Sequence, residues 1–326
     1  MTTTRIALAA FSVLLLIAGT DSASAYLAYI SNEKGNSVSV LDTDTMTVVA
    51  KIKTGQRPRG IEVSPDNKSV YVAVGDDDTI QIIDVATRKV MGKLPSGEDP
   101  EQFAIDPAGK YLYAANENDA KVSVIDLATR KRVREIPVGI EPEGIAVSPD
   151  GKTVVCTSET TSMAHFIDTD THTVTGSLLL GSRPRSAAFK SDGSELWVTS
   201  EIAGGLSIID PQTKQIKHVV KFAVQGLRAE AIQPVGINIT RDGRLGFIHL
   251  GPANRIAIVD GKTHVVVKYL LVGQRPWHGA LTPDEKYLLV ANGMTNDVSV
   301  IDVDSQKVIK SIQVGEMPWG IAVSQK

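Results

Sequence analysis

The sequence predicts an all-β fold, a seven-bladed β-propeller closed by its own termini. Two markers recur along its 326 residues: the proline of a Pro-x-Gly loop or its equivalent, and the aspartate of an Asp-x-x-Thr corner (Asp-x-x-Ser in the last copy). The prolines are Pro58, Pro100, Pro142, Pro184, Pro234, Pro276 and Pro318, and the aspartates are Asp42, Asp84, Asp126, Asp168, Asp210, Asp260 and Asp302. Each series advances by 42 residues with a single step of 50. A fixed period in the forties indicates a propeller or a solenoid.

Each copy holds four short strand patterns separated by turn residues, which is typical of an all-β repeat. The first is an apolar stretch after the proline, as in 144–148, and a Pro-Asp-Gly turn at 149–151 ends it. The second and third patterns are clear in 112–116 and 122–126. The fourth, as in 132–136, mixes charged and apolar residues and suits an outer strand half in water. The repeated aspartate turns the chain between the last two strands, so we interpret it as scaffold.

The two ends of the repeat array predict how the ring closes. Residues 317–324 read as a first strand with no other strand after it, and the chain from Tyr26 starts at a second strand. Placed together, these segments complete one blade. Closure by the termini removes exposed sheet edges. The longer step of 50 residues comes from an insertion around 223–233, which we interpret either as a lid or partner contact or as a tolerated loop.

The first 25 residues predict a secretory signal peptide. Arg5 precedes a mostly apolar run from Ile6 to Ala18, and Ala23-Ser24-Ala25 resembles a small-residue cleavage site. The run is too short to span a bilayer. We therefore expect residues 26–326 to form a single propeller domain in the periplasm, with no membrane span after cleavage.

Composition excludes several other classes. The net charge of −3 and the pI near 6.1 argue against a nucleic-acid-binding protein, which usually has a basic face. The lone Cys156 excludes an intramolecular disulfide and any CxxC motif. Six histidines occur without metal-ligand spacing, so no metal site is predicted, although His249 and His278 approach the loop-bearing face.

The repeat resembles the YVTN-type propeller family, whose pattern is roughly VGxxPxGIAVSPDGKxVYVAN…VSVIDxxT. The stretch from Val138 to Lys152 carries this pattern, and the resemblance covers residues 26–326. Within the family the chain looks like exported seven-repeat propellers that accompany pyrroloquinoline-quinone-dependent alcohol catabolism. That resemblance implies a setting shared with quinoprotein dehydrogenases, c-type cytochromes and a transporter, any of which would be the protein partner. It also implies that the quinone cofactor belongs to the partner enzymes, so none is expected here.

The residue after each repeat proline is predicted to lie at the mouth of the central channel, on the face that carries the loops. By blade, these residues are Trp319, Arg59, Glu101, Glu143, Arg185, Val235 and Trp277. We call this set the ring. Loops and strand ends on a rigid scaffold are where binding residues concentrate. A ring required only for folding could stay uniform, so its variation leads us to expect function to be encoded there.

An acidic sector covers three neighbouring blades on this face. Its members are Asp76, Asp77, Asp78, Asp99, Glu101, Glu117, Asp119, Glu141, Glu143 and Glu159. Three interpretations stay open: a solvated rim partly neutralised by Arg59 and Arg185, a docking surface for a basic partner, and a site for a hard cation. For docking, the predicted residues are Asp99, Glu101, Glu141 and Glu143.

The opposite sector combines tryptophans with cationic side chains. Its predicted ligand-binding residues are Arg57, Arg59, Arg185, Arg275, Trp277, His278 and Trp319. The indoles could hold a planar or apolar ligand while the arginines bind its carboxylate. The alternative is that the tryptophans plug the channel as packing residues.

The leading hypothesis is a non-enzymatic periplasmic propeller that binds a small ligand or docks a protein partner in quinone-linked alcohol oxidation. One rival is a propeller hydrolase or lactonase that uses His278 or His249 with a bound metal. Another is a cell-envelope interaction scaffold. The sequence identifies neither the ligand nor the partner.

Overall fold

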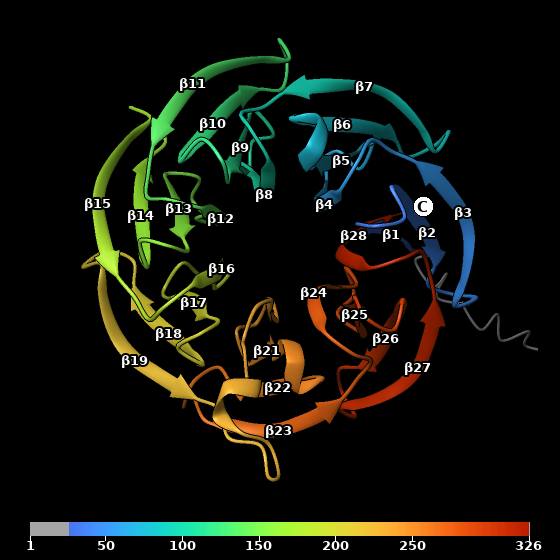
Figure 1. Ribbon diagram of the computed structural model, residues 1–326, viewed down its shortest axis with the longest axis vertical. Helices are drawn as coiled ribbons and strands as arrows, with labels where there is room; N and C mark the ends of the chain where they lie inside the picture. Colours follow the sequence, from blue (N-terminus) through green and yellow to red (C-terminus); the bar gives the residue numbers. More distant parts are fainter. Residues whose placement is uncertain (1–25, 326) are drawn as a thin grey trace, which may run out of the picture.

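The computed structural model describes residues 26–325, which form seven four-stranded antiparallel sheets arranged as blades around a central axis (Figure 1). The predicted all-β, seven-bladed propeller is confirmed. Figure 1 shows one strand of each blade nearest the axis and another, such as β3, β7 or β11, at the rim. The predicted signal peptide, residues 1–25, lies outside the described residues.

The blades take the strands in chain order, and blade 1 borrows its inner strand from the C-terminal end of the chain. The inner strands, by blade, are β28 (Pro318–Gln325), β4 (Pro58–Val63), β8 (Pro100–Ile105), β12 (Pro142–Val147), β16 (Pro184–Phe189), β20 (Ile237–Ile239) and β24 (Pro276–Leu281). The second strands are β1 (Tyr26–Asn32), β5 (Ser69–Val74), β9 (Tyr111–Asn116), β13 (Thr153–Ser158), β17 (Leu196–Ser200), β21 (Leu245–His249) and β25 (Tyr287–Asn292).

The remaining strands lie further from the axis. The third strands are β2 (Ser37–Asp42), β6 (Thr79–Asp84), β10 (Lys121–Asp126), β14 (Met163–Asp168), β18 (Gly205–Asp210), β22 (Arg255–Asp260) and β26 (Asp297–Asp302). The outer strands are β3 (Thr47–Lys53), β7 (Lys89–Pro95), β11 (Lys131–Pro137), β15 (Thr173–Leu179), β19 (Gln215–Lys221), β23 (Val266–Leu271) and β27 (Lys307–Gln313). Three single-turn 3₁₀ helices occur in loops: η1 (Gly75–Asp77), η2 (Ala229–Ala231) and η3 (Gly251–Ala253).

The core lies between neighbouring blades. Side chains of successive strand residues point to opposite faces of a blade, so each middle strand supplies apolar groups to two interfaces. Tyr29 and Val40 of blade 1, for example, pack against Val72 and Ile83 of blade 2. The outer strands are mostly exposed, as the mixed composition of 132–136 predicts. The seven interfaces together hold the ring rigid, which fixes the inner strands around the axis.

The termini close the ring as predicted. β28 pairs antiparallel with β1, from Tyr26 opposite Gln325 to Asn32 opposite Pro318. Figure 1 shows these two ends of the chain side by side within one blade. No blade therefore lacks its inner strand.

The repeated aspartates act as scaffold. Asp126 Oδ1 accepts hydrogen bonds from the backbone N–H of Thr129 at 2.7 Å and from its hydroxyl at 2.8 Å, and Asp84 holds Thr87 in the same way. Hydrogen bonds to the ionised form lower the pKa of these carboxyl groups.

The insertion lies in the loop between β19 and β20. It forms η2, and its Ile232 packs into the core between blades 5 and 6, whereas residues 225–230 are exposed. Among residues 26–325, no helix is long and apolar enough to cross a membrane.

Candidate functional site

The ring residues sit at the start of the inner strands, where the pairing with the second strand is interrupted. In blade 2, for example, Pro58 pairs with Val74 but the next paired residue is Ile61, so the intervening residues are displaced from regular pairing. Hydroxyl groups from second strands hold the ring backbone. Ser31 donates to the carbonyl oxygen of Arg59 at 2.6 Å, and Thr157 donates to that of Arg185 at 2.8 Å. The ring is thus fixed by its neighbours rather than by its own loop.

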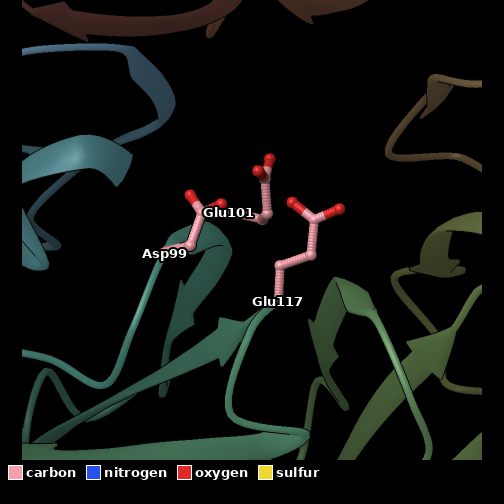
Figure 2. Close-up of side chains that lie close together, drawn as sticks. All are labelled: Asp99, Glu101 and Glu117. Carbon is pink, nitrogen blue, oxygen red and sulfur yellow. The ribbon is translucent and has the colours of Figure 1, made fainter.

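Ion pairs join the ring across blades. Arg59 Nη1 lies 2.6 Å from Glu101 Oε2, and its Nη2 lies 3.3 Å from Glu33 Oε1. Arg57 contacts the other Glu101 oxygen at 2.5 Å, pairs with Asp99 and lies 3.4 Å from Glu117. Figure 2 shows the carboxyl groups of Asp99, Glu101 and Glu117 gathered together, and Arg57 contacts all three of them.

A second network joins residues of blades 4, 5 and 7. Arg185 is 5% exposed, pairs with Glu159 and lies 3.0 Å from Glu143 Oε1. Arg183 contacts Glu159 at 2.7 Å, and Arg275 contacts Glu201 at 3.0 Å. Ion pairs between arginines and carboxyl groups therefore occupy much of the ring.

The networks shift the pKa values of their carboxyl groups in opposite directions. Burial opposes ionisation of Glu101, but Arg59 and Arg57 outweigh burial and hold its pKa below the usual value. Burial raises the pKa of Glu143 well above the usual value despite Arg185. Burial, followed by the hydrogen bond and charge of Glu101, raises the pKa of Glu117 to about 7.

The predicted docking residues are mostly inside the protein, which corrects that prediction. Glu101 is 0% exposed, Glu143 is 1% exposed and Asp99 is 9% exposed. Only Glu141, which accepts a hydrogen bond from Thr160, is half-buried rather than buried. The sequence did not show that arginines of adjacent blades cover these carboxyl groups.

The predicted ligand-binding arginines are also engaged. Besides their ion pairs, Arg275 lies over the Trp277 ring at 4.3 Å and Arg59 lies over the Trp319 ring at 5.7 Å. His278 packs on Trp319 with ring centroids 4.1 Å apart, and Trp319 is 2% exposed. The burial of Trp319 agrees with a packing role. No arginine of the ring is left to bind a ligand carboxylate among the described residues.

A cavity of 410 Å³ lies along the channel below the ring. Six inner strands line it: β4, β8, β16, β20, β24 and β28. Its polar lining residues are Glu62, Gln102, Ser186, Asn238 and His278, and Trp319 contributes from the ring. We call it the channel cavity. Of the predicted site residues, His278 and Trp319 line it.

Four lining residues were not among the predicted site residues, although the repeat pattern contains a signal for them: Glu62, Gln102, Ser186 and Asn238. Two residues after each repeat proline, four copies carry glycine, and four residues after it, five copies carry alanine. The exceptions are Gln102, Ser186 and His278 at the first position and Glu62 and Asn238 at the second. All five exceptions line the channel cavity.

The glycines at the first position have a packing reason. A Cβ on Gly60 would lie 2.3 Å from the backbone oxygen of Glu101, and one on Gly144 would lie 2.1 Å from that of Arg185. Adjacent inner strands approach too closely there for a side chain. The channel wall thus has room for a side chain at this position in the blades that carry Gln102, Ser186 and His278.

The two titratable groups that line the cavity, those of Glu62 and His278, are mainly uncharged at pH 7. Burial raises the pKa of Glu62 to about 8, partly opposed by the hydrogen bond that its Oε2 accepts from the backbone N–H of Ile105. Burial, together with His249 and Arg185, lowers the pKa of His278 well below its usual value. Asn238 donates to the carbonyl of Gly279 at 2.9 Å, and its Oδ1 lies 3.0 Å from His249 Nε2.

The three carboxyl groups of Asp99, Glu101 and Glu117 lie within 4.8 Å of one another, a separation that would suit a cation. Arg57 already supplies the positive charge at this position. The cluster contains no histidine, so the structure gives no metal-binding role to His249 or His278 through it.

These features define a class: a closed seven-bladed propeller with a charge-paired ring above a polar channel cavity. Within that class, the chain belongs to the lactonase seven-bladed β-propeller family, whose model matches residues 21–134 and 168–313. The unmatched segment 135–167 includes Glu143 and Glu159, which bind Arg185.

Several solved structures share the fold. Hydrazine synthase from Kuenenia stuttgartiensis matches with 23% identity and a TM-score of 0.77, covering 84% of this chain and 91% of that chain. A putative 6-phosphogluconolactonase from Bacteroides fragilis matches with 19% identity and a TM-score of 0.79, covering 94% and 99%. The dihydro-haem d1 dehydrogenase NirN matches with 16% identity and a TM-score of 0.68, covering 90% and 74%. No curated protein sequence matches the chain.

Proposed function

We propose that this protein is a binding propeller whose channel cavity captures a small molecule. The observation that carries the proposal is that the residues that depart from the repeat pattern line the same cavity. Side chains needed only for folding can stay as uniform as the aspartate corners do, whereas Glu62, Gln102, Ser186, Asn238 and His278 replace glycine or alanine and line one cavity. A cavity of 410 Å³ is at the small end of the range of about 300–1,000 Å³ for ligand sites.

A thermal-shift screen of a metabolite library tests this function. A ligand present at 100 times its Kd stabilises the folded state by about 2.7 kcal/mol, which raises the unfolding temperature. The Gln102→Trp variant, which fills the cavity, is expected to abolish the shift. Asp76→Ala, which changes an exposed side chain, is expected to retain it. The proposal fails if no compound shifts the unfolding temperature, or if the shifts persist in a folded Gln102→Trp variant.

Family membership favours lactone hydrolysis as a second candidate function. Hydrolysis needs a general base whose pKa lies near the working pH. Among residues 26–325, Glu62 is the only carboxyl group that lines the channel cavity, and its pKa of about 8 meets that need. Hydrolysis of simple sugar lactones is therefore expected to fall by at least a hundredfold in Glu62→Gln. Equal turnover in wild type and variant would exclude this role of Glu62.

We also propose that the protein works in the periplasm beside quinone-linked alcohol oxidation, with no quinone of its own. Support comes from the repeat resemblance and the signal-like residues 1–25. The exposed Asp76 and Glu98, on the rim of blades 2 and 3, would face a basic partner such as a c-type cytochrome or dehydrogenase. Cell fractionation tests the location. Co-purification with the partner, lost in the Asp76→Lys/Glu98→Lys variant but kept in wild type, tests the docking.

A further inference from the structure

We propose that the ligand of the channel cavity is an uncharged molecule bearing several hydroxyl groups, such as a sugar or a polyol, and not a phosphorylated or carboxylated one. This inference rests on the proposed binding function and adds the chemical class of the ligand. Three properties of the described residues carry it: the charge of the lining, its mixture of hydrogen-bonding groups, and the engagement of the nearby arginines.

The lining offers no positive charge. Among residues 26–325, no lysine or arginine lines the channel cavity, and burial keeps His278 neutral. Arg59 and Arg185 are each adjacent in sequence to a lining residue, but both are held in ion pairs. Arg59 binds Glu101 and Glu33, and Arg185 binds Glu143 and Glu159. A buried anion without a cationic partner is strongly disfavoured. A phosphate or carboxylate would therefore have to break the ion pairs of the ring to be bound.

The lining groups that remain for a ligand both donate and accept hydrogen bonds. Glu62 Oε2 is bound to the Ile105 N–H, and no hydrogen bond within residues 26–325 involves its Oε1. Gln102 has an amide whose only hydrogen bond in this part of the chain is a long one of 3.5 Å to the Ser186 hydroxyl. Amide, hydroxyl and protonated carboxyl groups each donate and accept. A ligand hydroxyl does the same, so a polyol matches this lining group by group.

A protonated amine would match the lining less well. It has donors only, so it would use the acceptor atoms and leave the donors of Gln102 and Ser186 without partners. It would also need Glu62 in its ionised form, which burial disfavours. A buried donor left unpaired costs about 1–3 kcal/mol. The cavity therefore selects a neutral ligand over both an anion and a cation.

Isothermal titration of the full chain at pH 7 with five probes tests the ligand class: D-glucose, xylitol, D-gluconate, glucose 6-phosphate and ethanolamine. We expect glucose or xylitol to bind at least tenfold more tightly than the three charged probes. Gln102→Leu is expected to weaken binding of the neutral probe at least tenfold. Asp76→Ala, whose exposed side chain lies outside the channel cavity, is the matched control and is expected to change it by less than threefold.

The outcomes separate the ligand class from the binding function. If a charged probe binds as tightly as the neutral ones and Gln102→Leu weakens it, the ligand class is wrong and the channel function stands. If none of the probes binds although the metabolite screen finds a ligand that needs Gln102, the ligand class is wrong and the channel function stands. If neither assay finds a ligand, both are overturned. Unfolding scans confirm that each variant is folded, and Ser186→Ala, a smaller change in the same lining, takes the place of Gln102→Leu should that variant fail to fold.

Discussion

Removing the Glu101 carboxylate is the sharpest test of the buried ring. Glu101→Ala leaves Arg59 with Glu33 alone and takes from Arg57 one of its closest partners. Deleting one member of a buried ion pair costs about 3–5 kcal/mol because the remaining charge stays buried. At about 2.1 cal/mol/K of unfolding entropy per residue, residues 26–325 give about 0.6 kcal/mol per degree. The unfolding temperature should therefore fall by about 5–8 °C.

Differential scanning calorimetry measures this fall. The matched control is Asp76→Ala, since Asp76 is 52% exposed and lies 3.8 Å from the same Arg57. Exposed ion pairs contribute about 0–1 kcal/mol, so the control should shift by less than about 2 °C. Glu101→Gln keeps an acceptor for the arginines and should fall between the two. A Glu101→Ala transition within 2 °C of wild type would refute the claim that the ring is a buried, mutually dependent charge network.

Three further expectations follow from single positions. The folded-state pKa of Glu62 is about 8 and its usual value is 4.5, so stability should decrease as pH rises from about 4.5 to 8. Glu62→Gln should remove this decrease, which is measured as the pH dependence of the unfolding temperature. Gly60→Ala places a Cβ 2.3 Å from a backbone oxygen and should destabilise by about 1–3 kcal/mol, whereas Gly92→Ala, with its nearest contact at 3.6 Å, should change denaturant midpoints little. The Cys156 thiol is buried and its pKa is raised, so a thiol reagent should react with it only after unfolding.

Each expectation has an outcome that contradicts it. The prediction for Glu62 is wrong if the unfolding temperatures of wild type and Glu62→Gln depend on pH in the same way. Equal denaturant midpoints for the two glycine variants would show that the inner strands can separate without cost. Rapid labelling of Cys156 in the native protein would show that blade 4 opens far more readily than its packing indicates.

The family resemblance and the structure agree on the scaffold but differ on where function lies. The sequence directed attention to the ring because it varies between copies. In the structure that variation is explained largely by charge pairing, as for Glu101 with Arg57 and Arg59. The functional proposal now concerns the channel cavity, which is lined by residues that follow the ring residues on the inner strands. Trp319 belongs to both regions and His278 directly follows the ring residue Trp277, which is why part of the predicted ligand site remains in the new one.

The sequence by itself determined the repeat, the number of blades and the closure of blade 1 by β28, because period, turn residues and strand patterns are local properties that each copy repeats. Asp126 and Thr129, three residues apart, could be interpreted without any tertiary contact. Only the tertiary structure decided which polar residues are exposed and which meet. Arg59 and Glu101 are 42 residues apart, yet their charges cancel at the ring. Burial and ion pairing depend on how closely neighbouring blades approach each other, and the sequence of a single repeat does not specify that separation.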